Sequence, residues 1–128
     1  MTFITFITWL VAFGLTYLLE AAVYHLPLVQ GIEAKPKTRR LMDCLMINAC
    51  THPFIFLVLP LLIEDTATTY VVVAEVFAIT AEALMLKRFG YLNPWRMSAV
   101  ANVVSWCFGS WLLYGVGALS YVLSKFLA

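Results

Sequence analysis

Four long apolar segments joined by short polar links are the feature that most limits how this chain can fold. The segments run over Phe3–Gln30, Leu41–Ile63, Thr68–Leu86 and Pro94–Phe126. A helix needs roughly 20 predominantly apolar residues to cross a bilayer, and each segment is about that long or longer. Short links make consecutive helices pack antiparallel. We therefore predict an all-α polytopic integral membrane protein whose four transmembrane helices form one antiparallel bundle over residues 1–128.

The composition agrees with a lipid environment. Hydrophobic residues make up 63% of the chain and charged residues 12%, whereas an ordinary soluble domain has about 25% charged residues. A small soluble domain has a high surface-to-volume ratio and could not bury this much apolar surface. The net charge of +1 also argues against a nucleic-acid partner, which would call for a basic face. The expected surroundings are the lipid bilayer and other membrane subunits.

The basic residues predict the orientation. Seven of the eight Lys and Arg residues lie in or beside the first and third links, namely Lys35, Lys37, Arg39, Arg40, Lys87, Arg88 and Arg96. Cytoplasmic loops of membrane proteins carry an excess of Lys and Arg. We therefore expect both links in the cytoplasm and both termini on the non-cytoplasmic side, in the inner membrane of a bacterium.

Several polar residues interrupt the apolar segments. A charged side chain at the bilayer centre costs roughly 2.5–3.5 kcal/mol on insertion scales. Such residues therefore face the protein interior and are functional candidates. The candidates for binding a proton or a metal ion are Glu20, His52, Glu75 and Glu82, with Asn48, Thr51, Asn102 and Ser105 as their neutral polar partners. Counting 1.5 Å of helix per residue, we expect them to form a polar core in the cytoplasmic half of the bilayer, with Glu82 as a cytoplasmic gate.

Two further features concern helix shape and packing. Ala101, Ser105 and Gly109 form a row of small residues four apart, which lets another helix approach closely. Pro53 lies inside the second segment, where it removes a backbone donor and is expected to kink the helix.

The two halves of the chain also share a short pattern. Asn48-x-x-Thr51-x-x-Phe54 in the second segment matches Asn102-x-x-Ser105-x-x-Phe108 in the fourth. Glu20 precedes the first Asn by 28 residues, and Glu75 precedes the second by 27. This spacing is typical of a parallel repeat about an axis along the membrane normal. A chance match between residues common in membrane helices remains the alternative.

Three functions are compatible with these residues. The first is binding of a proton or a divalent cation for transport or coupling, in a homo-oligomer or with partner membrane subunits; carboxylate and imidazole together suit Zn, Fe or Mn. The second is a non-catalytic accessory or assembly subunit of a larger membrane complex, in which the polar groups form interhelical hydrogen bonds. The third is an intramembrane enzyme that uses acid–base catalysis on a lipid or a quinone. No nucleophile-elbow, HExxH or phosphate-loop pattern favours the enzyme, and we assign no catalytic residue.

Overall fold

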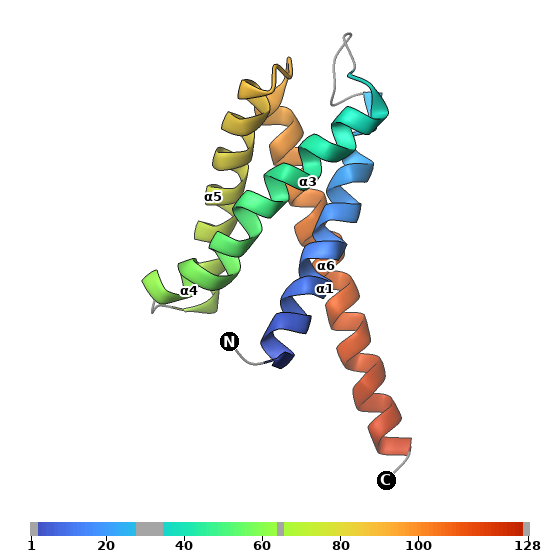
Figure 1. Ribbon diagram of the computed structural model, residues 1–128. Helices are drawn as coiled ribbons and strands as arrows, with labels where there is room; N and C mark the ends of the chain where they lie inside the picture. The colour runs from blue at the N-terminus through green and yellow to red at the C-terminus, as the bar shows by residue number, and fades with distance from the viewer. Residues whose placement is uncertain (1–2, 28–34, 64–65, 127–128) are drawn as a thin grey trace.

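The computed structural model describes residues 3–27, 35–63 and 66–126, with side chains except those of 3–5, 67 and 113–126. Its helices are α1 (Phe3–Val23), α3 (Lys37–Pro53), the π-helix η1 (Phe54–Val58), α4 (Leu59–Leu62), α5 (Ala67–Arg88) and α6 (Pro94–Phe126) (Figure 1). No strand occurs in these ranges, so the predicted all-α fold is confirmed for them.

Three stretches are long and apolar enough to cross a membrane by length and composition: α1, the run from α3 through α4, and α5. The predicted fourth span coincides with α6. Because the side chains beyond residue 112 lie outside the described part, a bundle of four spans stays a prediction.

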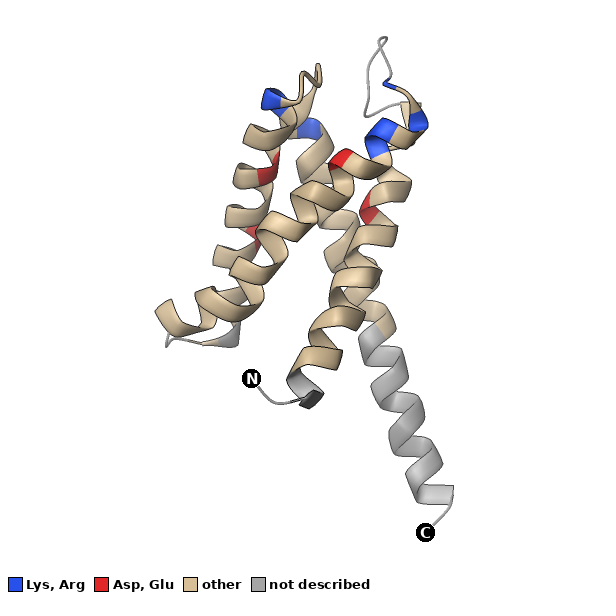
Figure 2. Cartoon of the chain, in the orientation of Figure 1, with Lys and Arg blue, Asp and Glu red and all other residues tan. Residues whose placement is uncertain are grey.

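The four long helices enclose a common interior. Helix α6 packs against α1 and α5, and α3 packs against the same two helices. Successive long helices run in opposite directions (Figure 1). Helices α1 and α3 diverge away from the end of the molecule at which the chain links them (Figure 1). The Lys and Arg residues whose side chains are described gather at that same end (Figure 2).

Helix α1 ends at Val23, so the prediction that it continues beyond that residue is wrong. The amides of His25 and Leu26 bond to carbonyls three residues back instead of four, which tightens the last turn. Pro27 has no amide hydrogen and disfavours helical geometry in Leu26. The remainder of the predicted segment, residues 28–34, lies outside the described residues.

The second predicted segment begins early and is interrupted where expected. Helix α3 begins at Lys37, four residues before the predicted start, and gives way to η1 directly after Pro53. Across η1 the amide of Leu59 bonds to the carbonyl of Phe54, five residues back. The next donor in this pattern would be Pro60, which has none. The carbonyl of Ile55 instead accepts a bond of 2.8 Å from the Tyr70 hydroxyl on α5.

Helix α5 has clear signals at both ends. Its N-cap is Thr66, whose hydroxyl accepts a hydrogen bond from the amide of Thr69. At the other end Gly90 has φ +79°, and the amides of Gly90 and Tyr91 bond to the carbonyls of Lys87 and Leu86. These two bonds form a Schellman motif, which favours glycine because of the positive φ.

A polar cluster closes the basic end of the interior. Asp43, 1% exposed, accepts bonds from Tyr91 Oη at 3.0 Å and Arg39 Nε at 2.9 Å. Lys35 lies 4.5 Å from the centre of the Tyr91 ring and donates to the carbonyl of Phe89. Burial and the bond to Asp43 raise the pKa of Tyr91, so its hydroxyl remains a donor. The cluster ties the segment before α3 to the link between α5 and α6.

The Tyr70 hydrogen bond gives the first testable prediction. Replacing Tyr70 by Phe should lower the free energy of unfolding by about 1–3 kcal/mol, because it leaves the carbonyl of Ile55 without a donor. Thermal unfolding in detergent, followed by circular dichroism, measures the change. Tyr17→Phe is the matched control, since Tyr17 packs against the core and its hydroxyl forms no hydrogen bond with the described residues. Equal melting temperatures for the two variants would contradict this role for Tyr70.

Candidate functional site

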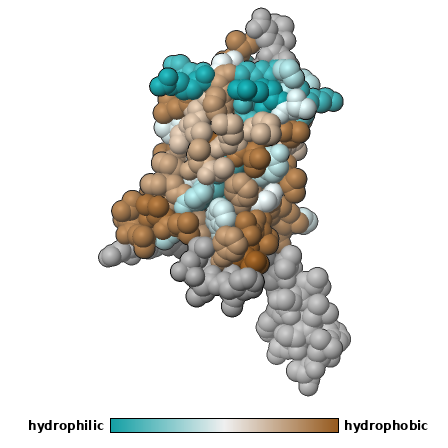
Figure 3. All heavy atoms as spheres, viewed as in Figure 1, coloured by the Kyte–Doolittle hydropathy of each residue, from teal (hydrophilic) through white to brown (hydrophobic). Residues whose placement is uncertain are grey.

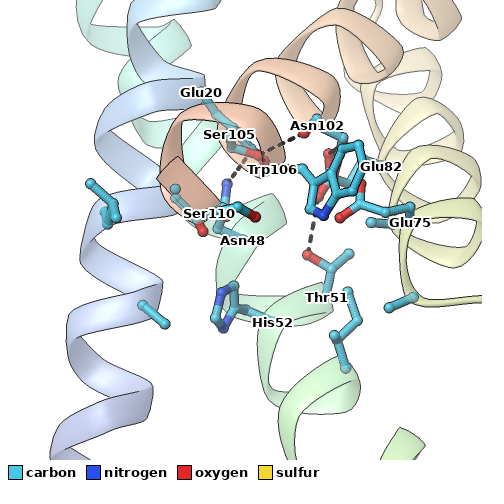
Figure 4. Close-up of a pocket in the computed structure, with 17 residues that line it drawn as sticks. Glu20, Asn48, Thr51, His52, Glu75, Glu82, Asn102, Ser105, Trp106 and Ser110 are labelled. Atoms are coloured by element: carbon cyan, nitrogen blue, oxygen red, sulfur yellow. Dashed lines mark hydrogen bonds between the residues drawn. The ribbon is translucent and has the colours of Figure 1, made fainter. Parts of the chain in front are cut away.

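The interior contains a cavity of about 200 Å³ between α1, α3, η1, α5 and α6. Its lining includes the four predicted candidates, Glu20, His52, Glu75 and Glu82, and their four predicted partners, Asn48, Thr51, Asn102 and Ser105 (Figure 4). The rest of the lining consists of Ala12, Leu15, Thr16, Ile55, Ala74, Ala78, Trp106, Gly109 and Ser110. Residues from both halves of the chain therefore share one cavity.

Glu20 is fully buried and receives hydrogen bonds from two helices. Its Oε2 accepts from Asn48 Nδ2 on α3 at 2.7 Å, and its Oε1 accepts from Ser105 Oγ on α6 at 3.3 Å. Asn48 Nδ2 also bonds to the carbonyl of Cys44, one turn earlier in α3, which fixes the amide toward the carboxyl group.

Glu82 has the same kind of surroundings. Its Oε2 accepts from Asn102 Nδ2 on α6 at 2.6 Å, and its Oε1 accepts from Thr51 Oγ1 on α3 at 3.3 Å. Asn102 Nδ2 also bonds to the carbonyl of Ser98, one turn earlier. The Ser98 hydroxyl adds a bond of 3.4 Å to the Glu82 carboxyl group.

The two glutamates are thus related by a pseudo-two-fold pattern. Each carboxyl group accepts from the Asn of its own helical hairpin and from a hydroxyl of the other hairpin. The hydroxyl residues, Thr51 and Ser105, each lie three positions after an Asn. These cross-bonds join the two hairpins at the centre of the cavity. We call these six residues, Glu20, Asn48, Thr51, Glu82, Asn102 and Ser105, the central network.

This pattern corrects one inference from the spacing. The sequence suggested Glu75 as the counterpart of Glu20, but Glu82 is the residue that bonds Asn102. The Asn follows the Glu by 28 positions in the first hairpin and by 20 in the second, because the link between α1 and α3 is longer. Spacing therefore misidentified the partner, although the Asn-x-x-hydroxyl pattern marked the correct positions.

Glu75 and His52 line the cavity outside the central network. Neither forms a side-chain hydrogen bond within the described residues, and His52 Nδ1 is buried without a partner there. The His52 ring meets Phe13 edge-on, with 5.6 Å between the ring centres. Trp106 lines the same cavity (Figure 4). These side chains leave polar groups available to a ligand.

The row of small residues on α6 lies toward α1. Ala101 is fully buried, and Ser105 bonds to Glu20 of α1. A Cβ atom placed on Gly109 would lie 3.9 Å from Leu15 Cδ2 of α1. Small side chains in this row thus let α6 approach α1 closely enough for the Ser105 bond.

Ser98 and Trp106 are two residues of the site that were not predicted but have a signal in the sequence. Ser98 donates to Glu82, and its signal is its position four residues before Asn102, which corresponds to Cys44 before Asn48. Trp106 lines the cavity at the position that corresponds to His52, four residues after the Asn. Aligning the two hairpins on their Asn residues would have indicated both.

The charge of the lining limits what the cavity can bind. It includes three carboxyl groups and one imidazole but no Lys or Arg. Within the described residues, no three His, Cys, Asp or Glu side chains are grouped as ligands for a metal ion. Carboxyl groups in such a place require neutralisation by protons or by a cation, since unpaired buried charge is costly.

Comparison with protein-family models, curated proteins and solved structures found no match to this chain.

The central network gives the second prediction. Asn48→Ala and Asn102→Ala should each lower the free energy of unfolding by about 1–3 kcal/mol, because each leaves a buried carboxyl oxygen without its amide donor. The two losses should be similar, since the two Asn residues have equivalent surroundings. Chemical denaturation in detergent measures them, with Val103→Ala as the control at a position 52% exposed. A loss for either Asn variant no larger than that of the control would contradict the prediction.

Proposed function

We propose that this chain is an integral membrane protein that crosses the bilayer four times. Its polar groups lie inside, while large apolar side chains such as Leu18, Leu61 and Trp111 are 66%, 77% and 72% exposed. Brown apolar residues dominate the side below the hydrophilic end in Figure 3. Lipid favours such a surface, because a helix satisfies its own backbone and needs only apolar side chains outside.

The proposed orientation places the basic end of the molecule in the cytoplasm. This end contains most of the Lys and Arg residues (Figure 2), as the positive-inside bias requires. Both termini would then lie on the non-cytoplasmic side of a bacterial inner membrane.

Cysteine labelling tests this orientation. In a variant with Cys44, Cys50 and Cys107 replaced by Ala, Thr68→Cys should react in intact cells with a membrane-impermeant maleimide. Lys87→Cys, at the opposite end of α5, should react only after the membrane is opened. Both positions are exposed, so neither should be shielded by the protein itself. The reverse labelling pattern would overturn the orientation.

We propose further that the cavity binds protons or a divalent cation for transport or coupling, in an oligomer or a larger membrane complex. The observation that carries this proposal is that three carboxyl groups line one cavity that has no Lys or Arg in its lining. A bound cation or bound protons would supply the missing positive charge. Glu20 and Glu82 are the proton acceptors in this proposal, and Glu75 with His52 offers the oxygen and nitrogen donors that a metal ion would use.

Proton movement in proteoliposomes tests the proposed function. Liposomes that contain the wild-type protein and a trapped pH indicator should acidify when a proton gradient is imposed, and Glu82→Gln should abolish the protein-dependent part of this signal. Asp43→Asn is the control, because the carboxylate of Asp43 has a cationic partner, Arg39. The same assay with Mn²⁺ or Zn²⁺ and a trapped metal indicator tests the divalent cation.

Two results would contradict transport: wild-type rates equal to those of empty liposomes for protons and both metals, or equal rates for Glu82→Gln and wild type.

A second candidate is a non-catalytic assembly subunit, favoured by one observation. All four carboxyl oxygens of Glu20 and Glu82 accept hydrogen bonds from neighbouring helices. This is the arrangement expected if these residues only hold the helices together. Co-purification of a stoichiometric membrane partner in mild detergent would support this candidate if the protein also shows no cation flux.

A further inference from the structure

The three carboxyl groups of the cavity differ in their availability to a ligand. Glu20 and Glu82 use both of their oxygens within the central network. Glu75 accepts no hydrogen bond from the described residues, although it lines the same cavity. A ligand that enters can therefore bind the Glu75 carboxylate without breaking a bond between helices.

The cavity that Glu75 lines has aromatic and aliphatic side chains in its wall. Trp106 lines it (Figure 4), as do Ala74, Ala78 and Ile55. A cavity of about 200 Å³ has room for roughly six heavy atoms, if each takes about the 30 Å³ that a water molecule occupies in the liquid. A carboxylate that is free to bind, in a cavity that also has apolar side chains in its wall, is the arrangement of small-molecule sites, in which few polar groups orient an apolar body.

The pseudo-two-fold pattern breaks at these positions. Glu75 lies seven residues before Glu82, where the first hairpin has Phe13 seven residues before Glu20. Trp106 likewise takes the position of His52. The central network is thus equivalent in the two hairpins, and the free carboxylate and the indole belong to the second hairpin alone. The departure from symmetry gives the cavity one anionic, aromatic side.

We propose that Glu75 and Trp106 form a binding site for a small organic ammonium ion, with the ammonium on the carboxylate and the alkyl part in the cavity. This rests on the proposed cation binding and names its substrate class. An indole attracts an ammonium through the negative face of its ring.

Calorimetric titration of the full chain in detergent with n-butylammonium chloride tests the site. Wild type should bind n-butylammonium, and the neutral analogue n-butanol should bind at least tenfold more weakly. Glu75→Gln should weaken n-butylammonium binding at least tenfold. Val76→Gln is the matched control, because Val76 is the next residue, is 61% exposed and is absent from the lining.

Trp106→Leu is a second variant in case Glu75→Gln does not fold. Trp106 is 48% exposed, so its replacement should leave the fold intact, and it should weaken n-butylammonium binding severalfold. Binding that is unchanged in Trp106→Leu and in a folded Glu75→Gln overturns the site, as does equal binding of n-butanol. Wild type that moves protons or binds Mn²⁺ but not n-butylammonium also overturns it, while the proposed function stands. Wild type that does none of these contradicts both.

Discussion

The hydrogen bonds between Asn48 and Glu20 and between Asn102 and Glu82 are the interactions on which the rest of the structure depends. They connect α1 to α3 and α5 to α6 at 2.7 and 2.6 Å. Each carboxyl group also accepts a hydrogen bond from a hydroxyl group of the opposite hairpin, so the network also joins the two hairpins. A polar group that is buried away from water is costly unless it finds a hydrogen-bond partner within the protein. The same residues thus stabilise the helix arrangement and define the cavity.

The polar residues divide into two sets with different physical roles. The central network is internally satisfied and equivalent in the two hairpins, which suits a scaffold that can also take up protons. Glu75, His52 and Trp106 lie outside it and differ between the hairpins. Some polar groups of the cavity are hydrogen-bonded to one another and others are free. Such a cavity can hold a ligand without losing its interhelical hydrogen bonds. This division reconciles the structural and the cation-binding interpretations, because each uses a different set of residues.

Much of this architecture could be predicted from the sequence, because polar residues in apolar helices have few alternatives to a shared interior. The beginning of α6 at Pro94 and the interruption after Pro53 follow from proline chemistry alone. The end of α1 at Val23 was missed, since an apolar segment that continues to Gln30 masks the effect of Pro27. The pairing of Glu82 with Asn102 was missed because the number of positions between a Glu and its Asn depends on the length of the link between their helices. That number alone does not give the distance between the two residues.

The Glu20 and Glu82 carboxyl groups are held in the network without a cationic partner among the described residues, and we propose that protons neutralise them. Infrared titration of the protein in lipid measures this directly, because neutral and ionised carboxyl groups absorb at different frequencies. We expect a neutral-carboxyl signal near pH 7 in wild type that decreases in Glu20→Gln and in Glu82→Gln and decreases further in the double variant, in which Glu75 is the remaining carboxyl group of the cavity. No neutral-carboxyl signal in metal-free wild type, or a signal unchanged in the double variant, would contradict it.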